Sequence, residues 1–192
     1  EIRAICDEKN ILLILDEVQC GVGRTGKLFA HEWVEIEPDI MMVAKGIGGG
    51  FPLGAVLAKE NAASGMTAGT HGSTYGGNPL GCSIGLKVMD IISDPDFLYD
   101  VNRKAKLFHD GLMELLKKNS SIFEEVRGKG LMLGLKCKVQ NIDVVNAGYS
   151  NKLLTVPAGD NVVRLLPPLT ISDKDINEAL NKLDGVMTAL SQ

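Results

Sequence analysis

The sequence has no long apolar run and no basic stripe, and each absence removes a class of protein. No apolar run reaches the roughly 18 residues of a membrane-spanning helix, and no signal peptide precedes the globular pattern. The net charge is −4, and basic residues are not interleaved with aromatic ones. We therefore expect neither a nucleic acid nor a membrane as a partner, and we expect a cytoplasmic protein.

The sequence also lacks the cysteine and histidine patterns of metal sites. Its four cysteines are widely scattered with no C-x-x-C pair, and its three histidines do not stand at ligand spacing from them. We expect no metal and no disulfide. The chain also opens without Met, and "EIRAICDEKN" resembles the tail of a helix already under way, so we expect the second part of a longer protein.

The composition is that of a folded protein, and the first half has an α/β pattern. Hydrophobic residues make up 45% of the 192 residues and charged residues 23%. Apolar runs at 11–15, 40–44 and 54–58 are separated by glycine-rich turns and crossover-length segments, which favours a buried, largely parallel sheet. A helix is expected from about Asn78 to Ile92.

The pattern changes at "SDPD", residues 93–96. Pro95 cannot continue the preceding helix, and Asp94 or Asp96 is suited to cap the next one. A long amphipathic helix from Phe97 then opens an α+β unit with strands near 131–137, 153–156 and 162–166 and a helix near 142–151. The last helix is expected to be capped by Ser172, with its inner face formed by Ile176, Leu180, Leu183 and Met187. We expect domains at 1–93 and 94–192.

Two phosphate-binding motifs are excluded by their context. The "GVGRTG" stretch at 21–26 matches G-x-G-x-x-G, but "DEVQC" separates it from the strand and Pro38 ends any following helix early. A Walker A motif at 44–50 would need its lysine after the glycines, whereas Lys45 precedes them. Both stretches are expected to be glycine turns that bind no nucleotide.

Three charged residues follow apolar strands. Asp16 and Glu17 come directly after 11–15, and Lys45 follows 40–44, so parallel strands would bring them to one edge of the sheet. Pyridoxal phosphate needs an amine to bond to its aldehyde and an acid to keep its ring nitrogen protonated. A partly desolvated lysine is also a better nucleophile. The alternatives are a solvated strand end and an ordinary salt bridge.

Two further stretches carry suitable groups. "HGSTYGGNPLG" at 71–81 offers the hydroxyls of Ser73 and Thr74 and glycines that let backbone amides approach an anion, just before a helix begins. Arg164 lies inside an apolar strand, and its planar fork matches a carboxylate. Alone, the first could be an ordinary loop and the second an internal salt bridge or a surface residue.

Four motifs together resemble the class III, or ornithine-type, aminotransferases: "ILDEVQCGVGRTG", "AKGIGGGFPLGA", "HGSTYGGNPLG" and "LLTVPAGDNVVRLLPPL". The resemblance implies the α/β fold of PLP-dependent transferases, fold type I. Residues 1–93 would be the C-terminal part of the large PLP-binding domain and 94–192 the C-terminal small domain. The family's upstream half, with its main phosphate-binding loop, has no counterpart in these residues, so the 192-residue fragment alone is expected to be inactive.

The resemblance also implies roles for individual residues. Lys45 would be the catalytic Schiff-base lysine and Asp16 the partner of the pyridine nitrogen. Val18 would pack on the ring and Gln19 would lie near the phenolic oxygen. Ser73 and Thr74 would serve the cofactor phosphate, with Thr74 reaching the other subunit of a homodimer. Arg164 would hold the substrate α-carboxylate.

Within the family, the third and fourth motifs are most similar to members that transfer an amino group between N-acetylornithine and 2-oxoglutarate in arginine biosynthesis. Three alternatives stay open. The parent protein could act on free ornithine, it could catalyse another PLP-dependent reaction such as an aminomutase step, or the fragment could serve only as a structural or interaction module.

Overall fold

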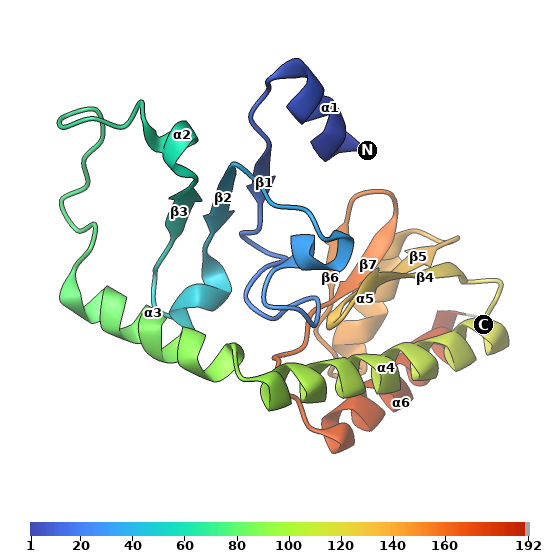
Figure 1. Ribbon diagram of the computed structural model, residues 1–192. Coiled ribbons are helices and arrows are strands. Elements are labelled where there is room, and N and C mark those ends of the chain that lie inside the picture. The colour runs from blue at the N-terminus through green and yellow to red at the C-terminus, as the bar shows by residue number, and fades with distance from the viewer. Residues whose placement is uncertain (191–192) are drawn as a thin grey trace. The chain divides into compact units, whose positions relative to one another are not determined.

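The computed structural model describes residues 1–190, and the chain divides into two units, Glu1–Leu98 and Tyr99–Gln192. Figure 1 labels their helices and strands. The correspondence of these units to the two domains expected at 1–93 and 94–192 stays a prediction. No helix within residues 1–190 has the length and apolar character that crossing a membrane requires.

The first unit is built on a three-stranded sheet in the order β1-β2-β3, formed by β1 (Ile14–Asp16), β2 (Ile40–Val43) and β3 (Ala55–Ala58). Strands β1 and β2 are parallel, but β3 runs antiparallel to β2, so the expectation of a largely parallel sheet is wrong for the third strand. The reason is the connection at 44–54, which is shorter than the dozen or so residues that a parallel crossover needs.

Strand β1 begins three residues later than the apolar run does. The side chain of Asp39 accepts a hydrogen bond from the N–H of Leu13 at 2.8 Å. The carbonyl of Leu13 in turn accepts one from the N–H of Asp39 at 2.8 Å. Arg3 also pairs with Asp39 at 2.8 Å. The hydrogen bond from Leu13 and the nearby guanidinium both hold the pKa of Asp39 below its usual value.

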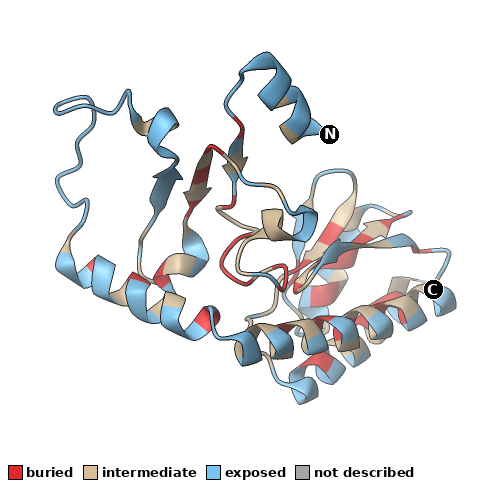
Figure 2. Ribbon diagram, viewed as in Figure 1, coloured by how far each residue is buried: buried red, intermediate tan, exposed pale blue. Residues whose placement is uncertain are grey.

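Burial is uneven over this sheet (Figure 2). Met41 and Val43 of the central strand β2 are buried, whereas all four residues of β3 are exposed and Ile14 of β1 is 52% exposed. The expectation that all three apolar runs are buried is therefore wrong for the described residues. Only the central strand has a neighbouring strand on each side.

Helices and turns complete the first unit. These are α1 (Ile2–Lys9), the 3-10 turns η1 (Ala30–Val34) and η2 (Lys45–Gly48), α2 (Glu60–Ala63) and α3 (Pro79–Ile92). Asn78 caps α3 by accepting from the N–H of Gly81 at 2.8 Å, and Pro79 occupies the first turn, where its missing N–H costs nothing. The structure confirms the helix expected at 78–92.

The second unit has a four-stranded antiparallel sheet in the order β4-β5-β7-β6. Its strands are β4 (Phe123–Lys129), β5 (Met132–Cys137), β6 (Val156–Ala158) and β7 (Val162–Leu165), and its helices are α5 (Asn141–Ser150), α6 (Asp173–Leu190) and α4 (Pro95–Lys118), which begins in the last residues of the first unit. The strand expected at 153–156 lies instead at 156–158. Strand β4, which contains four charged residues, was not predicted.

The expected caps are present. Asp94 accepts from the N–H of Asp96 at 2.8 Å at the start of α4, and the hydroxyl of Ser172 accepts from the N–H of Asp175 at 3.1 Å at the start of α6. Ile176, Leu183 and Met187 of α6 are buried as predicted, while Leu180 is half-buried. Leu180 packs against Gly111 of α4, where an added Cβ would stand 2.3 Å from the Leu180 Cδ1 atom.

Candidate functional site

Asp16 and Lys45 lie at the same edge of the first unit's sheet. Asp16 is the last residue of β1 and stands opposite Met42 of the parallel strand β2. Lys45 follows the end of β2 at Val43 and opens the 3-10 turn η2. Ligands of open α/β sheets bind at the carboxyl ends of parallel strands, which is where both side chains stand.

The backbone around Lys45 is tightly placed. Lys45 itself has φ 48°, a left-handed conformation that costs a non-glycine residue free energy and often marks functional sites. A Cβ at Gly46 would stand 3.3 Å from the Cβ of Val22, and one at Gly49, which has φ 55°, would stand 3.0 Å from Val88 of α3. Glycine therefore lets the loop after β1 and helix α3 approach the lysine turn closely.

The charged groups at this edge are available to a ligand. The Oδ1 atom of Asp16 accepts from the N–H of Val18 at 2.9 Å, and among residues 1–190 its Oδ2 atom has no hydrogen-bond partner. Lys45 likewise has no ion pair within the described chain, so the two residues do not form the salt bridge considered as an alternative. Lys45 is exposed, and the expectation of a partly desolvated amine is wrong for these residues.

Val18 and Gln19 follow Asp16 and Glu17, at the start of the loop that joins β1 to η1, and both are half-buried. The loop folds back on the strand end, because the N–H of Gly21 donates to the carbonyl of Glu17 at 3.0 Å. The "GVGRTG" stretch lies within this loop and precedes no α-helix, as its context predicted.

Glu17 has contacts at this edge that the sequence did not reveal. It is only 2% exposed, and its carboxylate accepts hydrogen bonds from the backbone N–H groups of Ala30 at 2.8 Å and His31 at 2.9 Å. The His31 Nδ1 atom lies 3.0 Å from the same carboxylate. The partners are 13 and 14 positions away in sequence, a separation at which no periodic pattern links residues.

The stretch 71–78 forms an exposed loop before α3. Ser73 and Thr74 are both exposed, and Ser73 lies beside a hollow of about 270 Å³. The hollow is lined by Pro52, Leu53, Gly54, Ser73, Tyr75, Gly76, Gly77, Asn78 and Cys82. Hydroxyls, glycine amides and the first turn of a helix thus meet there, which suits an anion. The role of Ser73 and Thr74 stays a prediction.

Arg164 belongs to the second unit. It lies on β7, opposite Gly134 of β5 and Val156 of β6, and is half-buried. Its assignment as the carboxylate-binding residue stays a prediction.

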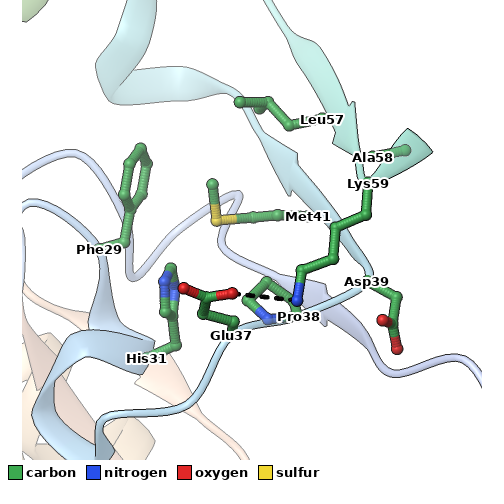
Figure 3. A pocket seen from close by; sticks show the side chains of 9 residues that line it. All are labelled: Phe29, His31, Glu37, Pro38, Asp39, Met41, Leu57, Ala58 and Lys59. Atoms are coloured by element: carbon green, nitrogen blue, oxygen red, sulfur yellow. Dashed lines mark ion pairs between the residues drawn. The ribbon is translucent and has the colours of Figure 1, made fainter. Parts of the chain in front are cut away.

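A second hollow, of about 340 Å³, lies where β2 begins and β3 ends, which is the opposite end of the sheet from Lys45 (Figure 3). Its lining includes the apolar side chains of Phe29, Met41 and Leu57. The charged side chains of Glu37 and Lys59 pair with each other at 3.0 Å. The other two titratable lining groups are also engaged, since His31 contacts Glu17 and Asp39 pairs with Arg3.

Comparisons with known proteins show the family and the fold of this chain. The model of the family "Aminotransferase class-III" matches residues 1–187. The chain belongs to the class-III aminotransferase family. Its fold is accordingly that of PLP-dependent transferases of fold type I, and the mixed α/β architecture expected from the sequence is confirmed.

Named relatives fall in two groups within the class-III family. An acetylornithine aminotransferase of Rhodobacter capsulatus is 64% identical over 98% of this chain and 48% of its own length, and one of Mesorhizobium japonicum is 57% identical over 95% and 46%. The crystal structure of N-acetylornithine aminotransferase from Stenotrophomonas maltophilia matches with a TM-score of 0.88 and 35% identity, covering 99% of this chain and 50% of that one. The ornithine aminotransferase of Toxoplasma gondii matches with a TM-score of 0.91 and 32% identity, covering 98% and 46%. The chain spans about half the length of the relatives it matches.

Proposed function

We propose that the parent protein is a pyridoxal-phosphate-dependent transaminase that moves an amino group between N-acetylornithine and 2-oxoglutarate. The observation that carries this proposal is the placement of Asp16 and Lys45 at the carboxyl ends of neighbouring parallel strands, each with a polar atom free of partners among residues 1–190. Class-III aminotransferases depend on pyridoxal phosphate, and a carboxylate and an amine at one edge fit that cofactor.

Each residue at the edge has a chemical task in this proposal. Bound pyridoxal phosphate would supply an electron sink for the negative charge that develops at the substrate α-carbon. Lys45 would hold the cofactor through Nζ and carry a proton from the α-carbon on the same atom. Asp16 would keep the ring nitrogen protonated through its unengaged Oδ2 atom. Because Oδ1 is held by the N–H of Val18, the carboxylate is already oriented.

The other predicted site residues would bind and orient the cofactor and substrate. Val18 would cover one face of the ring and exclude water, and Gln19 would lie near its phenolic oxygen. Ser73 and Thr74 would bind the phosphate, with Thr74 serving the cofactor of a second subunit, so the homodimer is part of the proposal. Arg164 would hold a substrate carboxylate with its two-point fork.

The choice of N-acetylornithine is supported by the names of the relatives at 64% and 57% identity. Free ornithine is the second candidate, since solved ornithine aminotransferases match with TM-scores of 0.90 and 0.91. The cytoplasm is the proposed location, supported by four free cysteines, which are typical of a reducing compartment.

Cofactor binding to the full-length protein tests the proposal. Pyridoxal phosphate bonded to the wild-type lysine should absorb near roughly 420 nm. The band should disappear in Lys45→Ala and persist in Lys87→Ala, a matched control because Lys87 is an exposed lysine of α3 in the same unit. No band in the wild type, or an unchanged band in Lys45→Ala, would overturn the assignment.

A substrate comparison tests the finer part. The turnover of N-acetylornithine with 2-oxoglutarate should exceed that of free ornithine when kcat/KM is measured for both amino donors on the same preparation. A clear preference for ornithine would replace the first candidate with the second while leaving the cofactor assignment in place.

A further inference from the structure

Glu17 lies at the end of the strand that presents Asp16, but it faces the other way. Successive side chains of a strand point to opposite faces, and here Asp16 is exposed whereas Glu17 is 2% exposed. The backbone is still in the sheet at this point, since the N–H of Glu17 donates to the carbonyl of Met42 at 2.9 Å. Glu17 is therefore the buried neighbour of the proposed ring-nitrogen partner.

Burying a carboxylate costs free energy unless hydrogen-bond donors satisfy it, and both carboxylate oxygens of Glu17 accept hydrogen bonds. Its Oε2 atom accepts from the N–H of Ala30, and its Oε1 atom accepts from the N–H of His31 and contacts the imidazole Nδ1. The thiol of Cys20 lies 3.5 Å from Oε2. Burial first, and then the charge of Glu17, raise the pKa of Cys20 to about 11, so this thiol stays protonated and can donate.

These bonds close the loop 18–29 onto the strand end. A Cβ at Gly21 would stand 2.8 Å from the carbonyl oxygen of Glu17 and 3.1 Å from its Oε2 atom, so the first turn of the loop is packed directly on Glu17. Val22, the next residue, is 2% exposed and has φ 55°. A β-branched residue keeps such a conformation only where its surroundings determine it.

The closed loop also reaches the lysine turn. Val22 is the residue against which Gly46 packs, with only 3.3 Å between the Val22 Cβ and a Cβ built at Gly46. Gly46 directly follows Lys45. The buried carboxylate of Glu17 thus sits one residue from Asp16 along the strand and is linked through Val22 to the residue beside Lys45.

We propose that Glu17 is a positioning residue, which clamps the loop 18–29 to η1 and so fixes the backbone of Lys45 relative to Asp16. Glu17 touches neither the cofactor nor the substrate in this proposal. It acts through Asp16 on one side and through Val22 on the other. The inference rests on the proposed function, because it concerns how the cofactor-binding pair is held.

The test compares Glu17→Gln with Glu32→Gln in the full-length protein. The amide of Glu17→Gln keeps the shape of the side chain but turns an N–H group toward one of the N–H donors. Glu32 is a matched control, since it accepts from the N–H of Phe29 at 2.7 Å within the same η1 segment without reaching β1. The measurements are the dissociation constant of pyridoxal phosphate and the pH midpoint of the bound cofactor's absorbance.

We expect Glu17→Gln to weaken cofactor binding by about tenfold or more and to move the pH midpoint, because misplacement by a fraction of an ångström is felt strongly in such sites. Glu32→Gln should leave both within about twofold, which is the scatter we allow for a local change. A purely structural role for Glu17 would lower the melting temperature of the cofactor-free protein without moving the pH midpoint.

A second variant keeps the proposal testable if Glu17→Gln does not fold. Val22→Ala leaves the Glu17 bonds intact, keeps the nearer Cβ and removes the Cγ1 atom, which stands 3.6 Å from a Cβ built at Gly46, so it should move the pH midpoint in the same direction by a smaller amount. An unchanged midpoint and affinity in Val22→Ala and in any folded Glu17→Gln protein would overturn the positioning role while leaving the proposed function standing. Failure of the wild type to bind the cofactor would instead overturn the proposed function, and this inference with it.

Discussion

Adding one methyl group beside Lys45, as Gly46→Ala, should disturb the site without removing any functional group. The new Cβ would stand 3.3 Å from the Cβ of Val22 and 3.6 Å from its Cγ1 atom, so one of the two segments must shift by a few tenths of an ångström. Val22 is buried and held at φ 55°, and it cannot yield by a simple rotamer change because the Cβ itself is in contact.

The magnitude follows from two opposing effects. Overpacking of a filled site costs about 1–3 kcal/mol, and a single methyl group this close belongs at the lower end of that range. Replacing glycine also reduces the conformational entropy of the unfolded chain, which stabilises the folded protein by about 0.4–1 kcal/mol. We expect Gly46→Ala to lower the free energy of unfolding by about 0.5–1 kcal/mol. If the shift falls on the lysine turn, cofactor affinity should drop by about threefold to tenfold.

Gly65→Ala is the matched control for this prediction. Gly65 lies in the same unit, has no heavy atom within 4 Å of an added Cβ and does not have a positive φ. This variant should be stabilised by up to about 1 kcal/mol and should bind the cofactor normally. Urea unfolding and cofactor titration of both variants provide the measurements. Equal behaviour of the two variants would refute the argument that Val22 leaves no room for a Cβ at residue 46.

Three further predictions concern other parts of the chain. Arg164→Lys should raise the KM for 2-oxoglutarate in steady-state assays with little change in the melting temperature, because lysine loses the two-point fork; an unchanged KM would return Arg164 to a structural role. Asp39 has a pKa below its usual value of about 3.9. Its ionised carboxylate therefore stabilises the fold above about pH 3.9, and this stability is lost as the pH falls through the lower pKa of the folded state. The difference in urea midpoint between the wild type and Asp39→Asn should accordingly narrow from pH 7 to about pH 3. Gly111→Ala places a Cβ 2.3 Å from the Leu180 Cδ1 atom and should lower the free energy of unfolding by about 1–2 kcal/mol, despite the better helix propensity of alanine. Gly111→Ala combined with Leu180→Ala should recover part of that loss. No loss of stability in the single variant would contradict the packing of Leu180 on Gly111.

The strand ends of the site could be predicted because they depend on local patterns. An apolar run followed at once by charged residues marks the end of a strand, and this is how Asp16 and Lys45 stood out. The caps at Asp94 and Ser172 were predicted for the same reason, since each is a polar side chain that accepts a hydrogen bond from a backbone N–H two or three residues later.

The errors arose where the length of a connection or a contact across space, and not an apolar pattern, decides the structure. The antiparallel direction of β3 follows from the length of its connection, and the late start of β1 from the side chain of Asp39 across the sheet. Strand β4 was missed because its residues "FEEVRGK" lack an apolar run, although pairing with β5 satisfies their backbone groups. Exposure of Lys45 and of β3 likewise depends on what packs beside them in space.

The sequence by itself determined the family, the order of the motifs and the residue types that suit pyridoxal phosphate, because these are properties of short segments read one at a time. Only the tertiary structure decided what holds those segments together. Glu17 looked like one of two similar acids at a strand end, yet the alternation of a strand turns Asp16 outward and Glu17 into a set of N–H donors 13 and 14 residues away. The difference between an exposed acid and a buried, hydrogen-bonded one is a matter of direction in space, which a linear pattern does not contain.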